Sequence, residues 1–140
     1  MQGRVFLGPT VDPPRLHVFG GRDRGDETVD RVRTVRTQRY RYIRNYMPDR
    51  PFLQTNRYKE ATYPTIWVLR SLAAEGRLTP LPAMLLAPSR PAEELYDVIA
   101  DPYESENLAA SPSHQEVLDQ LRVVLDSWII ESNDLGGIPE

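Results

Sequence analysis

One amphipathic segment near the C-terminal end constrains the fold most strongly. Seven apolar residues recur there with helical spacing, namely Val117, Leu118, Leu121, Val124, Leu125, Trp128 and Ile129. The pattern predicts an α-helix with one broad apolar face. Ser111 can cap this helix, and Pro112 suits its first turn. Because tertiary packing supplies most of the stability of such a helix, another part of the chain must offer a surface for it.

Two regions favour β-strands and together form the obvious partner. In residues 32–46, β-branched and tyrosine residues alternate with arginines on either side of residues 37–39, which predicts a β-hairpin. Residues 95–99 predict a further strand, which Asp101-Pro102 ends. We therefore expect an α+β fold in which a small sheet packs against the C-terminal amphipathic helix.

Three further segments can be placed from local signals. Residues 16–19 are an apolar run that predicts a short buried strand, stopped by Gly20-Gly21. Residues 22–30 are dense in charge and show no periodicity, so we expect a loop. Pro64 suits the start of a helix, and Gly76 suits its end.

Proline content predicts long irregular connections. The 140 residues include 13 prolines, which favours few regular elements joined by extended loops, here over residues 48–63 and 77–92. At this length we expect one domain. Its expected parts are an irregular arm at residues 1–14, a folded unit at 15–132 and a tail at 133–140.

Charge is distributed unevenly along the chain. Residues 1–60 hold 13 Lys and Arg against 7 Asp and Glu, whereas residues 61–140 hold 4 against 13. A basic first half can favour an anionic ligand. The alternative is that the two halves neutralise each other across the fold.

The segment Arg22-Asp23-Arg24 is the candidate polar site. Two neighbouring guanidiniums can grip a sulfate, phosphate or carboxylate group in bidentate fashion. Asp23 can orient the arginines or accept sugar hydroxyls. The alternative is a solvated segment whose charges neutralise one another.

A second set of candidates comprises His17, Asp26 and Glu27. Together they can supply a general base or metal ligands, although a lone histidine in an apolar run is more often a core residue. The chain has no cysteine, which excludes disulfides, thiolate zinc sites and cysteine nucleophiles. No pair of histidines has metal-ligand spacing, so we predict no metal site.

Composition also argues against nucleic acids and membranes as partners. Arginines and tyrosines interleave over residues 39–46, a pattern that can bind single strands. The net charge is −3, however, and no RNA-binding signature occurs, so we expect these arginines to pair with carboxylates of residues 93–106. Neither a run of about 18 apolar residues nor a long apolar N-terminal segment is present. We expect a soluble protein without a membrane span or signal peptide.

Several short motifs occur in order along most of the chain. They are Phe19-Gly20-Gly21-Arg22-Asp23-Arg24, Arg31-Val32-Arg33-Thr34-Val35-Arg36, Tyr40-Arg41-Tyr42-Ile43-Arg44-Asn45, Glu94-Leu95-Tyr96-Asp97 and Asp101-Pro102. This series resembles the C-terminal region of bacterial type I sulfatases of the arylsulfatase A or N-sulfoglucosamine sulfohydrolase-like kind. The resemblance implies a four-stranded antiparallel sheet packed on a terminal helix.

The resemblance also implies where the chemistry lies. In such enzymes a large N-terminal domain holds a formylglycine nucleophile, a calcium ion and most catalytic residues. The nucleophile arises from a C/S-x-P-S-R motif, of which Leu86-Ala87-Pro88-Ser89-Arg90 echoes only the end, with Leu86 at the reactive position. No cofactor is therefore expected in this chain. The segment that matches Arg22, Asp23 and Arg24 lies near the domain junction and helps to form the substrate pocket.

The sequence thus predicts a truncated sulfatase C-terminal domain that contributes substrate-pocket and structural elements without ordinary sulfatase turnover. Two alternatives stay open. One is a stand-alone hydrolase of sulfate or phosphate esters that uses residues 22–30, and the other is an anion-binding interaction module. The expected ligand is a sulfated or phosphorylated small molecule. A face left uncovered by a large domain would favour a homo-oligomer.

Overall fold

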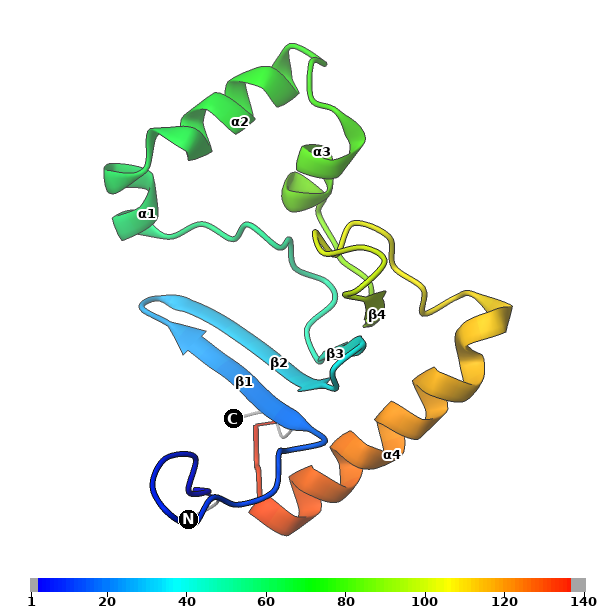
Figure 1. Cartoon of the computed structure of the whole chain (residues 1–140). Helices are drawn as coiled ribbons and strands as arrows, with labels where there is room; N and C mark the ends of the chain where they lie inside the picture. Colours follow the sequence, from blue (N-terminus) through cyan, green and yellow to red (C-terminus); the bar gives the residue numbers. More distant parts are fainter. Residues whose placement is uncertain (1–2, 137–140) are drawn as a thin grey trace.

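The computed structural model describes residues 3–136 and contains one four-stranded sheet with helices on both sides (Figure 1). The predictions for the ends of the arm and the tail fall on residues 1–2 and 137–140, outside the described residues. The domain boundaries stay predictions. The elements in chain order are β1 (Val18–Gly25), β2 (Thr28–Arg36), β3 (Tyr40–Asn45), α1 (Arg57–Thr62), α2 (Pro64–Ala74), α3 (Pro80–Leu86), β4 (Glu93–Asp97), a 3-10 turn (Pro112–His114) and α4 (Gln115–Ser132).

The sheet confirms the predicted α+β class. Its strand order is β1-β2-β3-β4, and every neighbouring pair is antiparallel. The predicted hairpin is β2–β3, and Thr37 closes its turn because its hydroxyl accepts a hydrogen bond from the Tyr40 amide at 2.8 Å. The predicted strand at residues 95–99 is β4, which lies two residues earlier in the chain.

The core lies between the sheet and α4. Val35, Tyr42 and Leu95 of the sheet are fully buried, and they pack against α4 residues Leu118, Leu121 and Leu125. Burying each side chain of this size contributes roughly 1.5–3 kcal/mol. At the edge of this layer Phe19 stacks on Trp128. The predicted apolar face of the C-terminal helix is thus confirmed. Ser111 does not cap the helix backbone, however, because its hydroxyl lies 3.0 Å from Nδ1 of His114.

The prediction of a loop at residues 22–30 is wrong, because these residues belong to the β1–β2 hairpin. Gly20 and Gly21 do not stop the strand. A Cβ at Gly20 would lie 3.3 Å from the Thr34 methyl group, and one at Gly21 would lie 3.0 Å from the Arg33 side chain. Small residues here let the neighbouring strand pack closely. The hairpin turns at Asp26, whose φ of 53° is left-handed.

The long connection between β3 and β4 contains three helices. The helix predicted to begin at Pro64 is α2, and Gly76 follows it with a φ of +67°. Two helices inside the predicted loops were missed. In α1 the cap is Asn56, whose side chain accepts from the Lys59 amide, and α3 tolerates its prolines because they lie in its first turn. Helices α1–α3 and α4 lie on different sides of the sheet (Figure 1).

Among residues 3–136 no helix combines the length and the apolar character that crossing a membrane requires.

Candidate functional site

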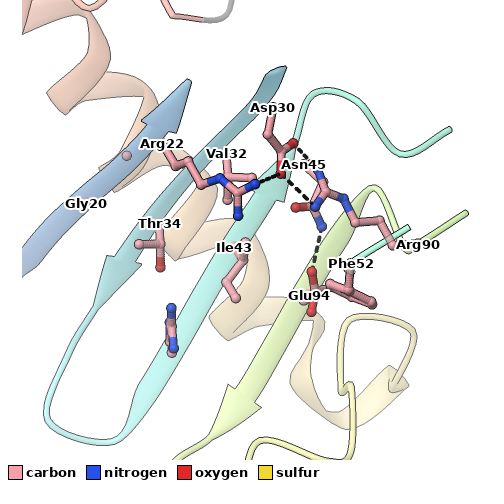
Figure 2. Close-up of a pocket in the computed structure, with 12 residues that line it drawn as sticks. Gly20, Arg22, Asp30, Val32, Thr34, Ile43, Asn45, Phe52, Arg90 and Glu94 are labelled. Carbon is pink, nitrogen blue, oxygen red and sulfur yellow. Dashed lines mark hydrogen bonds and ion pairs between the residues drawn. The ribbon is translucent and has the colours of Figure 1, made fainter. Parts of the chain in front are cut away.

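The sheet face opposite α4, called here the outer face, is hollowed into a cavity of about 410 Å³ (Figure 2). Strand alternation places every second residue of β2, β3 and β4 on this face. The lining residues are Gly20, Gly21, Arg22, Asp30, Val32, Thr34, Arg41, Ile43, Asn45, Phe52, Arg90 and Glu94. An adjoining, more apolar cavity of about 640 Å³ shares Arg41, Ile43, Phe52 and Glu94 and reaches α2 and α3.

Asp30 is the buried centre of the site. Its carboxylate is fully buried and accepts two hydrogen bonds from Arg90, of which Nη1–Oδ2 measures 3.0 Å, and one of 2.8 Å from the Arg31 amide. Burial by itself would raise the pKa of Asp30. Hydrogen bonds from Arg90 and the Arg31 amide, together with the charges of Arg90 and Arg22, outweigh that effect and hold the pKa below its usual value. Asp30 is therefore a fixed negative charge under the cavity.

Arg22 forms an ion pair with Asp30, which holds its guanidinium in place. Its Nη2 lies 3.5 Å from Oδ2 of Asp30, and 43% of its side chain is exposed. Figure 2 shows Arg22 and Arg90 approaching Asp30 from opposite sides. Arg90 is only 3% exposed, so its role is to neutralise Asp30, whereas Arg22 presents its guanidinium to the cavity.

A second polar group lines the β3–β4 side of the cavity. Glu94 is buried and accepts hydrogen bonds from Nδ2 of Asn45 at 2.5 Å and from the Tyr96 hydroxyl at 2.6 Å. Burial and the neighbouring Glu94 raise the pKa of Tyr96 above its usual value, so Tyr96 stays a neutral donor. These three side chains form a satisfied buried network on the floor of the site.

The structure separates the three predicted substrate-contact residues. Only Arg22 lines the cavity. The pairing of β1 with β2 is irregular between Arg22 and Arg24. Asp23 binds Arg33, with 2.7 Å between Oδ1 and Nη1, and Arg24 donates from Nε to the Asp26 carbonyl at 2.8 Å.

The structure does not bring His17 to Asp26 and Glu27. His17 precedes β1, whereas Asp26 and Glu27 follow it, and an eight-residue strand places these ends roughly 25–30 Å apart. Glu27 accepts a hydrogen bond from the Arg57 amide, which lowers its pKa. Within residues 3–136, no three His, Cys, Asp or Glu side chains gather in a way that would hold a metal ion. The described residues therefore do not fit the calcium site that the resemblance implies for the large domain.

Sequence reasoning missed most of the cavity. Asp30 appeared only as part of the expected loop at residues 22–30, Asn45 and Glu94 only in the motif series, and Arg90 only as the end of a motif echo. In the structure, Arg90 neutralises the charge of the buried Asp30. Residues 22–30 show no periodicity, so no local signal marked Asp30. The signal available for Glu94 was its place in the Glu94-Leu95-Tyr96-Asp97 motif, next to the predicted strand.

Several ion pairs join the basic and acidic parts of the chain. The hairpin arginines pair with later carboxylates, namely Arg33 with Asp134, Arg39 with Asp97, Arg41 with Glu104 and Arg44 with Asp126. The expected neutralisation across the fold therefore accounts for much of the charge asymmetry.

Comparison with known proteins gives relatives along the whole chain, although no family model matches it. The chain is 38% identical over all its 140 residues to an ulvan-active sulfatase of Formosa agariphila, of which it covers 23%. A second ulvan-active sulfatase of that organism is 30% identical over 112 residues, which are 20% of its length. A Delta 4,5-hexuronate-2-O-sulfatase of Bacteroides thetaiotaomicron is 45% identical over 42 residues, 30% of this chain and 9% of that protein.

A solved structure shares the fold. A 2-O GAG sulfatase superposes with a TM-score of 0.56 at 22% identity, over 94% of this chain and 19% of that one. At this identity the likeness shows the fold alone. The chain thus spans less than a quarter of the length of each of these proteins.

Proposed function

We propose that the outer face of this chain forms one wall of a substrate pocket. The premise is that the chain is related to sulfatases along its whole length and matches a C-terminal region of that family. The observation that carries the proposal is Arg22. Its guanidinium faces the cavity, is partly exposed and is anchored by the buried Asp30. A guanidinium that is already oriented loses little entropy when it binds a sulfate or carboxylate.

The substrate class follows from the relatives and from the cavity. By their names, two relatives act on ulvan and one is a Delta 4,5-hexuronate-2-O-sulfatase. We infer a glycan that carries sulfate esters and uronate carboxylates. Arg22 meets an anionic group of this glycan, and Thr34 lines the same cavity with a hydroxyl oxygen that can accept from a sugar hydroxyl.

The chain contributes binding and orientation, and we expect it to lack sulfatase turnover by itself. None of its 140 residues is a cysteine, and no C/S-x-P-S-R motif occurs. Without a nucleophile, only positioning and electrostatic stabilisation are left. We expect calcium and the nucleophile to be supplied by residues other than these.

A stand-alone hydrolase is the less favoured function. That alternative required a general base or metal ligands among His17, Asp26 and Glu27, which lie at opposite ends of β1. Incubation of the 140-residue protein with an aryl sulfate or an aryl phosphate, with calcium added, should release no phenol above the buffer rate. Sustained turnover by the purified protein would overturn the proposal.

Binding is tested by isothermal titration of the 140-residue protein with an unsaturated hexuronate 2-O-sulfate disaccharide. Arg22→Ala should weaken binding by about tenfold, the usual effect of one charge-assisted contact. The matched control is Arg77→Ala, which removes the same charge from an exposed residue that lines neither cavity. If the Arg22→Ala and Arg77→Ala variants bind the disaccharide equally well, Arg22 is not the anion contact.

A further inference from the structure

We propose that the cavity binds two anionic groups of one glycan chain, the first at Arg22 and the second at Arg41. The inference rests on the proposed function and deepens it, because it makes a polyanionic oligosaccharide the preferred substrate. Neither the sequence motifs nor the relatives single out Arg41.

Four arginines near the sheet fall into two kinds. Arg33 and Arg90 are 4% and 3% exposed, and each binds carboxylates through more than one nitrogen. Arg22 and Arg41 are 43% and 35% exposed, and each meets a carboxylate through one nitrogen. Arg33 and Arg90 are therefore structural arginines. Arg22 and Arg41 each keep N–H donors that no carboxylate engages.

The spare donors of Arg22 and Arg41 belong to the same cavity. Both residues line it. In the part of the chain that the structure describes, no hydrogen bond engages Nε or Nη1 of Arg22, or Nε or Nη2 of Arg41. Two free nitrogens on each guanidinium give it room for one more carboxylate or sulfate.

Each guanidinium is held in place by an acidic residue from another part of the chain. Asp30 anchors Arg22, and its charge is already balanced by the buried Arg90. Glu104 anchors Arg41, with 2.8 Å between Oε2 and Nη1. These ion pairs orient both guanidinium groups before a ligand binds, which lowers the entropy cost of binding.

The register of the sheet sets the spacing between the two arginines. Arg22 is aligned with Val32, and Val32 with Asn45, so Arg22 lies two strands, about 10 Å, from Asn45. Arg41 lies four residues before Asn45, about 13 Å along the strand. The two Cα atoms are therefore roughly 16 Å apart, which suits anionic groups on different sugar units better than a single sulfate.

The surface near Arg41 suits sugar rings. Ile43 and Phe52 line both this cavity and the adjoining one, as does Arg41. Apolar and aromatic side chains pack against the C–H faces of a pyranose, while the charged groups of the sugar meet the guanidiniums.

The test compares three probes on the 140-residue protein by isothermal titration. They are galactose 6-sulfate with one anion, a heparin-derived hexasaccharide with many, and maltohexaose with none. The hexasaccharide should bind at least about tenfold tighter than galactose 6-sulfate because a second contact adds to the first. Maltohexaose should not bind measurably.

Two substitutions separate the contacts. Arg41→Ala should lower the affinity for the hexasaccharide by about tenfold and leave the affinity for galactose 6-sulfate unchanged. Arg22→Ala should lower the affinity for both probes. Arg77→Ala serves as the charge-matched control, because Arg77 lines neither cavity, and it should change the binding of neither probe by more than about twofold. Arg41→Gln, which keeps a donor toward Glu104, replaces Arg41→Ala if that variant does not fold.

The outcomes are distinguishable. If Arg22→Ala weakens both anionic probes while Arg41 substitutions change nothing, this inference fails and the proposed function stands. A loss of galactose 6-sulfate binding in the Arg41 variants would mean that both arginines hold one sulfate, which also overturns the two-anion inference. If Arg22→Ala changes no probe, the proposed function itself fails.

Discussion

The buried pair of Arg90 and Asp30 gives the sharpest test of how this site is built. The perturbation is Arg90→Met, which keeps a long apolar side chain but removes the charge. The Asp30 carboxylate is fully buried and Arg90 is 3% exposed, so water cannot replace the lost partner. The substitution leaves Asp30 with the Arg31 amide and the more distant Arg22.

Removing one partner of a buried ion pair costs about 3–5 kcal/mol. We expect the lower end of that range, about 3 kcal/mol, because Arg22 still lies 3.5 Å from Oδ2 of Asp30. A matched control is Arg77→Met. Arg77 pairs with Glu75 at 2.7 Å, but the two side chains are 68% and 49% exposed, so its loss should cost less than about 1 kcal/mol.

The assay is urea-induced unfolding followed by circular dichroism, at pH 7 and at pH 4. In the native protein the pKa of Asp30 is lowered, so the pair stabilises the fold above the ordinary value of 3.8 and loses this contribution as pH falls below it. In Arg90→Met, burial should raise the pKa of Asp30. The free-energy difference between the variant and the wild type should then be largest at pH 7 and smaller at pH 4.

The double variant Asp30→Leu/Arg90→Met completes the test. With both charges removed, no buried charge is left unpaired, so we expect a stability above that of Arg90→Met and a coupling free energy of about 2 kcal/mol or more. The reasoning is refuted if Arg90→Met costs no more than Arg77→Met at pH 7.

Three further outcomes follow from the structure. Hydrogen bonds from Arg122 hold the pKa of Glu93 down at about 2 instead of 4.5. The free energy of unfolding should therefore fall by about 1–2 kcal/mol as pH drops from about 4.5 toward 2, a value reduced because the pair is partly exposed. In urea unfolding, Glu93→Gln should make the free energy of unfolding depend less on pH over this range. A Cβ at Gly136 would overlap the Arg33 guanidinium, so Gly136→Ala should cost about 1–3 kcal/mol, and an unchanged melting temperature would contradict that packing. Exposed apolar side chains on α2 and α3 should make the 140-residue protein self-associate, which light scattering would disprove by giving a monomeric mass.

Long periodic patterns made part of the fold predictable. The apolar face of α4 and the alternation over β2 and β3 each repeat over several residues, so local sequence indicates both the element and its buried side. On β3 this alternation places Tyr42 in the core and Arg41, Ile43 and Asn45 on the outer face.

Local signals failed where distant residues decide the conformation. The segment at residues 22–30 has no periodicity of its own, and it becomes strand because it pairs with β2. Gly20 and Gly21, just before this segment, resemble a turn signal, yet they leave room for the side chains of Thr34 and Arg33 on β2. The short helices α1 and α3 carry too few residues for a hydrophobic pattern, and the prolines of α3 suggested only a loop.

The sequence by itself determined the fold class and the sulfatase relationship. It named Arg22 together with Asp23 and Arg24, because three adjacent charges cannot be told apart without knowing which way each side chain points. Only the tertiary structure decided that Arg22, and not Asp23 or Arg24, lines the cavity, that the buried Asp30 holds it in place, and that Arg41 lines the same cavity. The physical reason is that a binding site depends on strand register and on burial, and both are set by contacts between residues far apart in the chain.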